Sequence, residues 1–372
     1  MAFAIGVLYR HIVKPILFLF PADLVHEWAL TMGEWFGRFS FTRGIAGAFL
    51  SFAHPSLQTE VAGISFQNPV GLAAGFDYNG RLIHIIPSVG FGFHTIGTVT
   101  HLPYEGNPRP MLGRLPRSQA LLVNKGFKNA GVEHILSQVP LHARGPVGIS
   151  IGSTNRPYPS FDAVVADIVS GFQKAIEHPL FSYFELNISC PNLIHVTSFQ
   201  ERPDTPEGLA RILSALSALP LSRPVFIKMP LERTREEIDA LVAVAEPFMF
   251  IRGFVFSNLV KDRSNPRLDP QEVASAGKGN FSGAPTREGA NALISHVAQH
   301  YGKRFIIIGC GGIFTAEDAY EKIRLGASLV QMITGMVYFG PQRIGEINKG
   351  LVRLLKRDGY AHIHEAVGAA HR

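Results

Sequence analysis

The sequence predicts a (β/α)8 barrel preceded by a small N-terminal helical extension. From about residue 61, short apolar runs alternate with longer amphipathic segments, and about eight such strand–helix units fit on the chain. The apolar runs are continuous rather than alternating, which is typical of parallel strands covered on both faces. A doubly wound open sheet is the less favoured alternative. We therefore expect a helical extension over residues 1–50 and a barrel over residues 51–372.

The first 39 residues are apolar and aromatic but are interrupted by basic residues such as Arg10 and Lys14. The longest uninterrupted run, Pro15–Ala22, is far shorter than the roughly 20 residues of a membrane-spanning helix. No small-residue cleavage site follows it, so we do not expect a signal peptide. We expect a pair of short helices, which either lie in a membrane interface with the basic side chains near headgroups or pack on the barrel as an ordinary hairpin.

Each barrel strand is expected at one apolar run, and each outer helix at the amphipathic segment that follows. The helix before the last strand shows the pattern well: Thr315 is an expected N-cap for residues 315–327, with Glu317 and Asp318 in the first turn. The eight expected strands cover residues 70–75, 95–100, 146–151, 184–189, 224–229, 253–258, 305–310 and 329–334.

Composition excludes several classes of function. The net charge is +6, yet lysines and arginines form no cluster typical of a nucleic-acid-binding face, so we expect no nucleic-acid partner. A mild positive charge favours acidic ligands and anionic membrane surfaces. The two cysteines form neither a disulfide framework nor a zinc spacing, which favours a reducing compartment. The 15 histidines show no HExxH spacing, and no metal site is expected.

The carboxyl ends of the strands carry the chemistry of a barrel. Small, hydroxyl and amide groups stand there, together with one lysine and no pair of carboxylates. The residues at these ends are Ala74, Gly75, Thr98, Ser150, residues 187–192, Lys228, Ser257, Asn258, Gly311, Gly312, Thr334 and Gly335.

The segments "IIIGCGGIF" and "MITGMVYFGP" follow the last two strands, where barrels commonly bind a phosphate through backbone N–H groups. Gly311 and Gly312 let the backbone approach an anion, and Thr334 adds a hydroxyl donor. The alternative is that the glycines only form a tight turn. The glycine spacing of a dinucleotide fingerprint is missing.

The other residues at the carboxyl ends of the strands, which we call the rim, indicate which kind of cofactor carries this phosphate. Ala74 and Gly75 form a flat floor without large side chains, suitable for a planar ring. Lys228 places a positive charge where it stabilises a reduced flavin. Two alternatives for Lys228 stay open: a structural lysine paired with a carboxylate, and a Schiff-base nucleophile of the aldolase kind. Asn187 and Asn258 supply the amide donors and acceptors that such a ring requires.

The ordered motifs "NPVGLAAGFD", "IGTVT", "NISCPN", "KMP", "FSN", "SGAP", "GCGGI" and "LVQMITGMVYFGP" resemble the dihydroorotate dehydrogenase family along nearly the whole chain. The segment "FPADLVHEW" resembles the extension of the membrane-associated class, which passes electrons to quinone. The resemblance implies an FMN-bearing enzyme of pyrimidine biosynthesis that oxidises dihydroorotate to orotate, peripheral on the cytoplasmic side of a membrane. It assigns to FMN the residues Ala74, Gly75, Thr98, Ser150, Asn187, Lys228, Ser257, Gly283, Gly312 and Thr334, to which the phosphate loops add Gly311 and Gly335.

Cys190 lies in the motif "NISCPN", at the position of the family's base. The resemblance implies that it removes a proton from C5 of dihydroorotate while a hydride leaves C6 for flavin N5. A thiol with a pKa near 8.5 must have its pKa lowered, or lose its proton in concert with hydride loss. The alternative is a buried cysteine acting as a small apolar residue. The membrane-associated class normally has serine here, whereas cysteine is usual in the soluble classes. Cys310 is expected to be a core residue.

Several departures from the family fall on the substrate side. The family's "AAGLDK" reads "AAGFDY", so Tyr78 replaces a lysine; "NRMGFNN" reads "VNKGFKN", so Val123 replaces an asparagine; and Leu259 replaces threonine or serine. The segment "NLIHVTSFQ", residues 192–200, replaces the family's active-site loop. Asn124 or Lys125 are possible compensating groups. The substrate contacts that we expect are Tyr78, Asn124, Phe127, Asn187, Asn192 and Asn258.

These departures leave alternatives open. A missing hydrogen bond to a charged ligand costs about 1.5–3 kcal/mol, so several losses favour the same flavin chemistry on a less polar substrate. A second alternative is a Schiff-base aldolase or lyase that uses Lys228. A third is a membrane-bound interaction module without catalysis.

Overall fold

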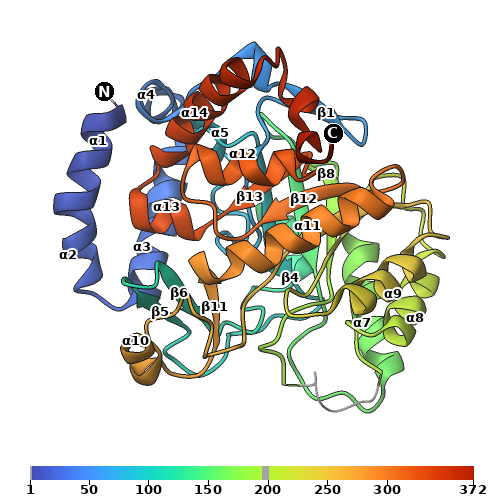
Figure 1. Cartoon of the computed structure of the whole chain (residues 1–372). Helices are drawn as coiled ribbons and strands as arrows, with labels where there is room; N and C mark the ends of the chain where they lie inside the picture. Colours follow the sequence, from blue (N-terminus) through green and yellow to red (C-terminus); the bar gives the residue numbers. More distant parts are fainter. Residues whose placement is uncertain (1, 195–200) are drawn as a thin grey trace.

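The computed structural model describes residues 2–194 and 201–372, and it confirms the predicted barrel (Figure 1). Eight parallel strands close in the order β10-β12-β13-β3-β4-β7-β8-β9. Each strand lies at one of the predicted apolar runs, and nearly all of its residues are buried on both faces, as the continuous pattern requires; Arg252 of β10 is the exposed exception. The strands are β3 (Val70–Leu72), β4 (Phe93–Val99), β7 (Val147–Ile151), β8 (Phe181–Asn187), β9 (Val225–Lys228), β10 (Ile251–Phe256), β12 (Ile306–Cys310) and β13 (Leu329–Met332).

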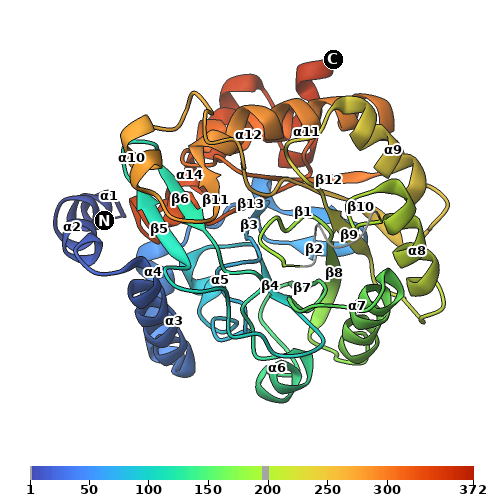
Figure 2. The same cartoon turned by 90° about the horizontal axis from the view of Figure 1, so that it is seen from below.

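Helices surround the strands (Figure 2). Thr315 caps α12 as predicted: its side chain accepts a hydrogen bond from the N–H of Asp318, whose carboxylate accepts in return from the N–H of Thr315. Such a capping box stabilises a helix start by about 1 kcal/mol. The helices are α5 (Ile86–Val89), α6 (Val132–Gln138), α7 (Phe161–Ala175), α8 (Pro206–Leu216), α9 (Arg235–Ala245), α11 (Arg287–Tyr301), α12 (Ala316–Arg324), α13 (Thr334–Phe339) and α14 (Arg343–Asp358).

A hairpin closes the amino end of the barrel. Its strands are β1 (Thr59–Val61) and β2 (Ile64–Phe66). Phe66 packs edge-on against Phe93 at the start of β4, with ring centroids 5.3 Å apart. Because this end is filled with apolar side chains, only the carboxyl end of the barrel remains open for a ligand.

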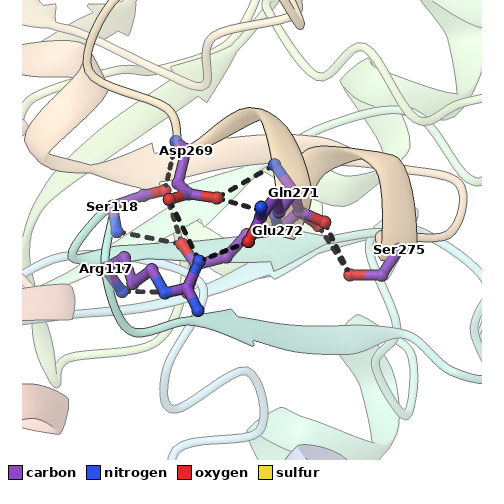
Figure 3. A network of polar contacts seen from close by, with 6 residues as sticks. All are labelled: Arg117, Ser118, Asp269, Gln271, Glu272 and Ser275. Atoms are coloured by element: carbon purple, nitrogen blue, oxygen red, sulfur yellow. Dashed lines mark hydrogen bonds and ion pairs between the residues drawn. The ribbon is translucent and has the colours of Figure 1, made fainter.

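A small antiparallel sheet stands beside the open end. Its strands are β5 (Leu112–Leu115), β6 (Ala120–Val123) and β11 (Asn280–Gly283). Helix α10 (Pro270–Ser275) docks on the β5–β6 turn (Figure 3). The carboxylate of Glu272 accepts hydrogen bonds from the N–H of Arg117 at 2.8 Å and from the hydroxyl of Ser118 at 2.7 Å. This docking fixes the sheet, which carries residues 123–127 to the rim.

The N-terminal extension is longer and more continuous than the predicted pair of short helices. Helices α1 (Ala2–Leu8) and α2 (Lys14–Phe18) are joined through a π-helical turn at Tyr9–Val13, and α3 (Ala22–Arg38) and α4 (Ser40–Leu50) follow. Arg10 and Lys14 lie within this continuous helical segment and are half-buried. Figure 1 shows α1 and α2 at one edge, beside α13. No helix in the described chain has the length and apolarity to cross a membrane.

Apolar surface is concentrated on this extension. Among the described residues, 16 of the 20 large apolar side chains that are exposed lie between positions 7 and 49. Leu19 and Phe41 are 82% and 75% exposed, whereas Met249, on the barrel, is an isolated case at 71%. Part of this surface lines the cavity described below, for example Met32 and Phe36, whereas a concentration of exposed apolar side chains such as Leu19 and Phe41 is typical of an interaction face.

Candidate functional site

A cavity of about 750 Å³ starts at the carboxyl ends of the strands and continues between the π-helical turn and helices α2, α3 and α4. Eleven of the twelve predicted cofactor residues line it. The exception is Ser150, which is fully buried and whose hydroxyl lies 2.9 Å from the hydroxyl of Thr98. Ser150 therefore supports the cavity wall from behind. The eleven residues are Ala74, Gly75, Thr98, Asn187, Lys228, Ser257, Gly283, Gly311, Gly312, Thr334 and Gly335.

The loops after β12 and β13 expose backbone rather than side chains. Gly312 has a φ of +69°, and a Cβ there would lie 2.5 Å from the Cβ of Arg287. A Cβ on Gly335 would lie 2.2 Å from the carbonyl oxygen of Ile313. Only glycine fits at these positions, so the backbone can approach an anion closely. This geometry fits the predicted phosphate end of FMN.

Two polar side chains on the cavity wall have no protein partner. Lys228 is buried, and its Nζ has no ion-pair or hydrogen-bond partner in residues 2–194 and 201–372. The hydroxyl of Ser257 is buried and also lacks a partner there. Buried polar groups are almost always hydrogen-bonded in native proteins, so these two imply a bound ligand. They argue against a structural lysine and fit the ring of a flavin, to which Lys228 would offer a positive charge.

A chain of hydrogen bonds orients the amides beside these groups. The Nδ2 of Asn187 donates to Thr98 Oγ1 at 2.9 Å, and the Nδ2 of Asn258 donates to the hydroxyl of Ser189 at 2.8 Å. The Ser189 hydroxyl donates in turn to Asn187 Oδ1 at 3.3 Å. Both amides are therefore fixed where they line the cavity, as predicted.

Cys190 lies on the same wall as a partly buried free thiol. Burial raises its pKa to about 12, although the N–H of Asn192 and the charge of Lys261 act in the opposite direction. A lowered pKa, the first of the two expected options, is thus wrong, because burial outweighs the hydrogen bond from Asn192 and the charge of Lys261. The second option, in which the proton moves in concert with hydride loss, remains. Asn192 is held by two amide contacts: its Nδ2 donates to Val123 O at 3.1 Å, and its Oδ1 accepts from Asn280 at 2.7 Å.

The other predicted substrate residues separate into two groups. Phe127 lines the cavity, with Val123 and Leu259 beside it. Asn124 does not line it, because its amide oxygen turns to Asn107 and accepts a hydrogen bond of 3.0 Å. The segment 195–200, most of the predicted active-site loop, lies outside the described residues.

Tyr78 lines the cavity but directs its hydroxyl away from the barrel, donating a hydrogen bond to Glu27 of α3. The Nζ of Lys125 lies 4.3 Å from the centroid of the Tyr78 ring and 3.0 Å from His26 Nδ1. We name these four residues, Tyr78, Glu27, His26 and Lys125, the helix–barrel junction. The sequence identified Lys125 only as a possible compensating residue, and it did not identify His26.

The environment of the junction strongly lowers the pKa of two side chains, Lys125 and His26. Burial lowers the pKa of Lys125 to about 7, while the negative charges of Asp23 and Glu27 act in the opposite direction. Burial, and then the positive charge of Lys125, lower the pKa of His26 to about 3. His26 is therefore neutral at physiological pH. A sequence signal existed: His26 precedes the buried Leu30 by one helical turn, which places both on the inner face of α3.

Across the described part of the chain, no group of three or more histidine, cysteine or acidic side chains is placed to hold a metal ion.

Comparisons with known proteins agree with this site. Residues 56–355 match the family model "Dihydroorotate dehydrogenase". The chain is 34% identical over 358 residues to the dihydroorotate dehydrogenase (quinone) of Nocardia farcinica, covering 96% of each chain. It is 36% identical over 367 residues to that of Anaeromyxobacter dehalogenans, covering 97% of this chain and 96% of the relative. The crystal structure of the Eimeria tenella DHODH in complex with ferulenol superposes with a TM-score of 0.79 at 26% identity, covering 93% of this chain and 96% of the other.

These matches extend over nearly the whole chain, including the cavity-lining motifs and the N-terminal helices. The chain therefore belongs to the dihydroorotate dehydrogenase family of oxidoreductases.

Proposed function

We propose that this protein is an FMN-dependent dehydrogenase that oxidises dihydroorotate to orotate and passes the electrons to a quinone. The observation that carries this proposal is one cavity in which Cys190, three asparagines and an unpaired Lys228 face the same space. A thiol base, amides for a ring of carbonyls and N–H groups, and a cation for a reduced flavin are the groups that this reaction needs.

Bound FMN would supply the hydride acceptor of the reaction. Lys228, Ser257 and the glycines of the two phosphate loops would hold it. Asn187 and Asn258 would orient the substrate through the hydrogen-bond chain that fixes their amides. The thiolate of Cys190 would remove the proton from C5 as the C6–H bond breaks. Because burial disfavours this thiolate, the thiol would first give its own proton to solvent, and the rate would rise with pH.

The part of the cavity between the N-terminal helices suits the apolar acceptor. Side chains such as Val13, Leu17 and Val25 line it, and it is continuous with the flavin rim. Electrons from the flavin therefore have a short path to a quinone that binds there, without mixing of quinone and substrate sites.

The exposed apolar face of these helices supports peripheral binding to the cytoplasmic side of a membrane. Replacing Leu19 and Phe41 by serine should weaken binding to phospholipid vesicles by about 10-fold, because each side chain adds about 1.5–3 kcal/mol when fully buried and less in an interface. Vesicle sedimentation measures this. Met249→Ser, equally exposed on the barrel, is the matched control; equal loss in both proteins would contradict the proposal.

A second candidate keeps the flavin chemistry but changes the substrate. Val123 and Leu259, which replace polar residues of the family, both line the cavity. Tyr78, which replaces a lysine, gives its hydroxyl to Glu27 rather than to a ligand. These positions make the pocket less polar than orotate requires and favour a less polar cyclic substrate.

The deciding experiment is anaerobic addition of dihydroorotate to the purified protein while the visible flavin absorbance is followed. Rapid bleaching supports dihydroorotate as the substrate. A yellow protein that stays yellow supports the second candidate. A protein that purifies without flavin contradicts both flavin-dependent candidates and supports the alternative of a Schiff base on Lys228.

A further inference from the structure

The apolar half of the cavity contains few polar side chains, and most of them are already satisfied. The hydroxyl of Tyr9 donates to the carbonyl of Val337 at 2.7 Å. The hydroxyl of Thr42 and the guanidinium of Arg114 each donate to a backbone carbonyl of the N-terminal extension. Lys125 differs from these groups, because its only hydrogen bond in the described chain is to His26.

The hydrogen bonds fix the role of each nitrogen. His26 Nε2 lies 2.8 Å from the carbonyl oxygen of Phe76, which only accepts, so Nε2 carries the proton. His26 Nδ1 is then an acceptor, and Lys125 donates to it. An ammonium group has three N–H donors, so two remain, and no carboxylate lies within ion-pair distance of Lys125 in residues 2–194 and 201–372. A buried cation without an ion pair is costly, unless a ligand accepts from it or it loses its proton.

We propose that Lys125 donates a hydrogen bond and one proton to a carbonyl oxygen of the quinone that reoxidises the flavin. This inference rests on the proposed function. Bound reduced FMN would supply two electrons and one proton, whereas a quinone needs two electrons and two protons to become a hydroquinone. The Lys125 ammonium supplies the second proton, becomes a neutral amine, and regains a proton from solvent.

The position of Lys125 favours the acceptor over the substrate. Its partner His26 belongs to α3, whose inner face lines the quinone half of the cavity. The substrate groups Cys190 and Asn258 follow strands β8 and β10 on the barrel wall of the same cavity. The hydrogen bond of Lys125 to His26 places its Nζ beside the helices.

The surroundings allow Lys125 to exchange its proton near neutral pH. Burial holds its pKa at about 7, so both protonation states are populated there. Reoxidation should therefore slow as the pH rises through about 7, because the ammonium form is lost. Glu27, 40% exposed and hydrogen-bonded to Tyr78, connects the junction with solvent. The charged and titratable groups that face Lys125 are Asp23, His26 and Glu27 of α3, Tyr78 and Arg81 of the loop after β3, and Lys128 of its own loop.

The test uses the full-length, FMN-loaded protein. Its flavin is reduced anaerobically by light and EDTA, and reoxidation by a water-soluble short-chain benzoquinone is followed by stopped-flow absorbance. Lys125→Met should slow reoxidation by about 100-fold, as expected for loss of a general acid, and should abolish the decline above pH 7. Lys125→Arg keeps the charge but does not release a proton, so it should retain quinone binding and lose the pH dependence.

Lys128→Met is the matched control. Lys128 also faces the Tyr78 ring, at 5.7 Å, but it pairs with Glu27 at 3.5 Å. This variant should reoxidise at close to the wild-type rate. Equal slowing in Lys125→Met and Lys128→Met would mean that general electrostatics, rather than proton donation, controls the rate, and would overturn the proposal.

A second measurement does not depend on turnover. In protein labelled with ¹³C at lysine Cε, one resonance should titrate near pH 7 and be absent from Lys125→Met. Adding the same quinone to the oxidised protein, which has no electrons to give, should shift that titration upward, because the quinone oxygen stabilises the ammonium form. An unchanged titration overturns the proposal.

Photoreduction separates this inference from the proposed function, because reoxidation is measured without dihydroorotate. Bleaching by dihydroorotate together with unchanged reoxidation in Lys125→Met would overturn the inference alone. A loss of bleaching with normal reoxidation in that variant would assign Lys125 to the substrate and also overturn it.

Discussion

The flavin rim and the helix–barrel junction border the same cavity but are built differently. The rim consists of glycines, hydroxyls and amides that follow strand ends, each within a short sequence motif. The junction consists of side chains from three distant segments: α3, the loop after β3 and the segment after β6. A site made of backbone and small residues can be predicted from short sequence motifs, whereas a site made of long side chains from distant segments depends on tertiary contacts.

The two regions also differ in how they tolerate charge. Within residues 2–194 and 201–372 the rim gives Lys228 no partner, and a bound anionic flavin would compensate its charge. The junction buries Lys125 against a neutral histidine and an aromatic face, so its proton becomes labile. We therefore expect substitutions in the rim to act on FMN and substrate chemistry, and substitutions in the junction to act on docking and acceptor reduction.

The largest expected effect belongs to Cys190 on the rim. Cys190→Ala should slow flavin reduction by dihydroorotate by about 10³-fold, because it removes the general base. Since the pKa of the thiol is raised to about 12, the wild-type rate should keep rising with pH to at least pH 9 without a plateau. Stopped-flow bleaching across this pH range measures both effects. Cys190→Ser, which keeps a proton acceptor, should recover part of the rate; a serine variant as slow as the alanine variant would argue against a base at this position.

A smaller effect is expected at the phosphate loop of the rim. Gly335→Ala places a Cβ 2.2 Å from a backbone oxygen, and overpacking of this kind costs about 1–3 kcal/mol, or up to about 100-fold in FMN affinity. The ratio of flavin to protein absorbance after dialysis measures the loss. At Gly277 an added Cβ meets nothing within 4 Å, so Gly277→Ala is the control. Full flavin content in Gly335→Ala would mean that this loop does not touch the cofactor.

The smallest effect is expected at the junction. Tyr78→Phe removes the hydroxyl that donates to Glu27, and because Glu27 is partly exposed, water replaces much of the bond. We expect a loss of about 1 kcal/mol in the free energy of unfolding, measured by urea denaturation. Glu27→Gln and the double variant complete a double-mutant cycle, which isolates the coupling between the two side chains. If the losses of the two single variants add up in the double variant, the hydrogen bond between Tyr78 and Glu27 does not contribute to the stability of the helix–barrel contact.

Prediction from the sequence was accurate where the signal is local. The eight strands and the Thr315 cap follow from apolar runs and capping residues, and eleven of the twelve predicted cofactor residues line one cavity. It was less accurate where a neighbour outside the motif decides the outcome. Asn124 was expected to contact substrate but turns to Asn107, and the thiol of Cys190 was allowed a lowered pKa that burial excludes.

The sequence by itself determined the barrel, the position of its open end and the small-residue rim, because these depend on periodicity and on residues that permit close backbone approach. Only the tertiary structure decided which side chain provides the charge at the junction. Tyr78 stands where the family has a lysine, and Lys125 supplies a positive charge beside it. Their proximity depends on how β6 and α3 pack beside the loop after β3. The pKa of a side chain is set by burial and neighbouring charges, and folding brings these neighbours together from segments as far apart as residues 26 and 125.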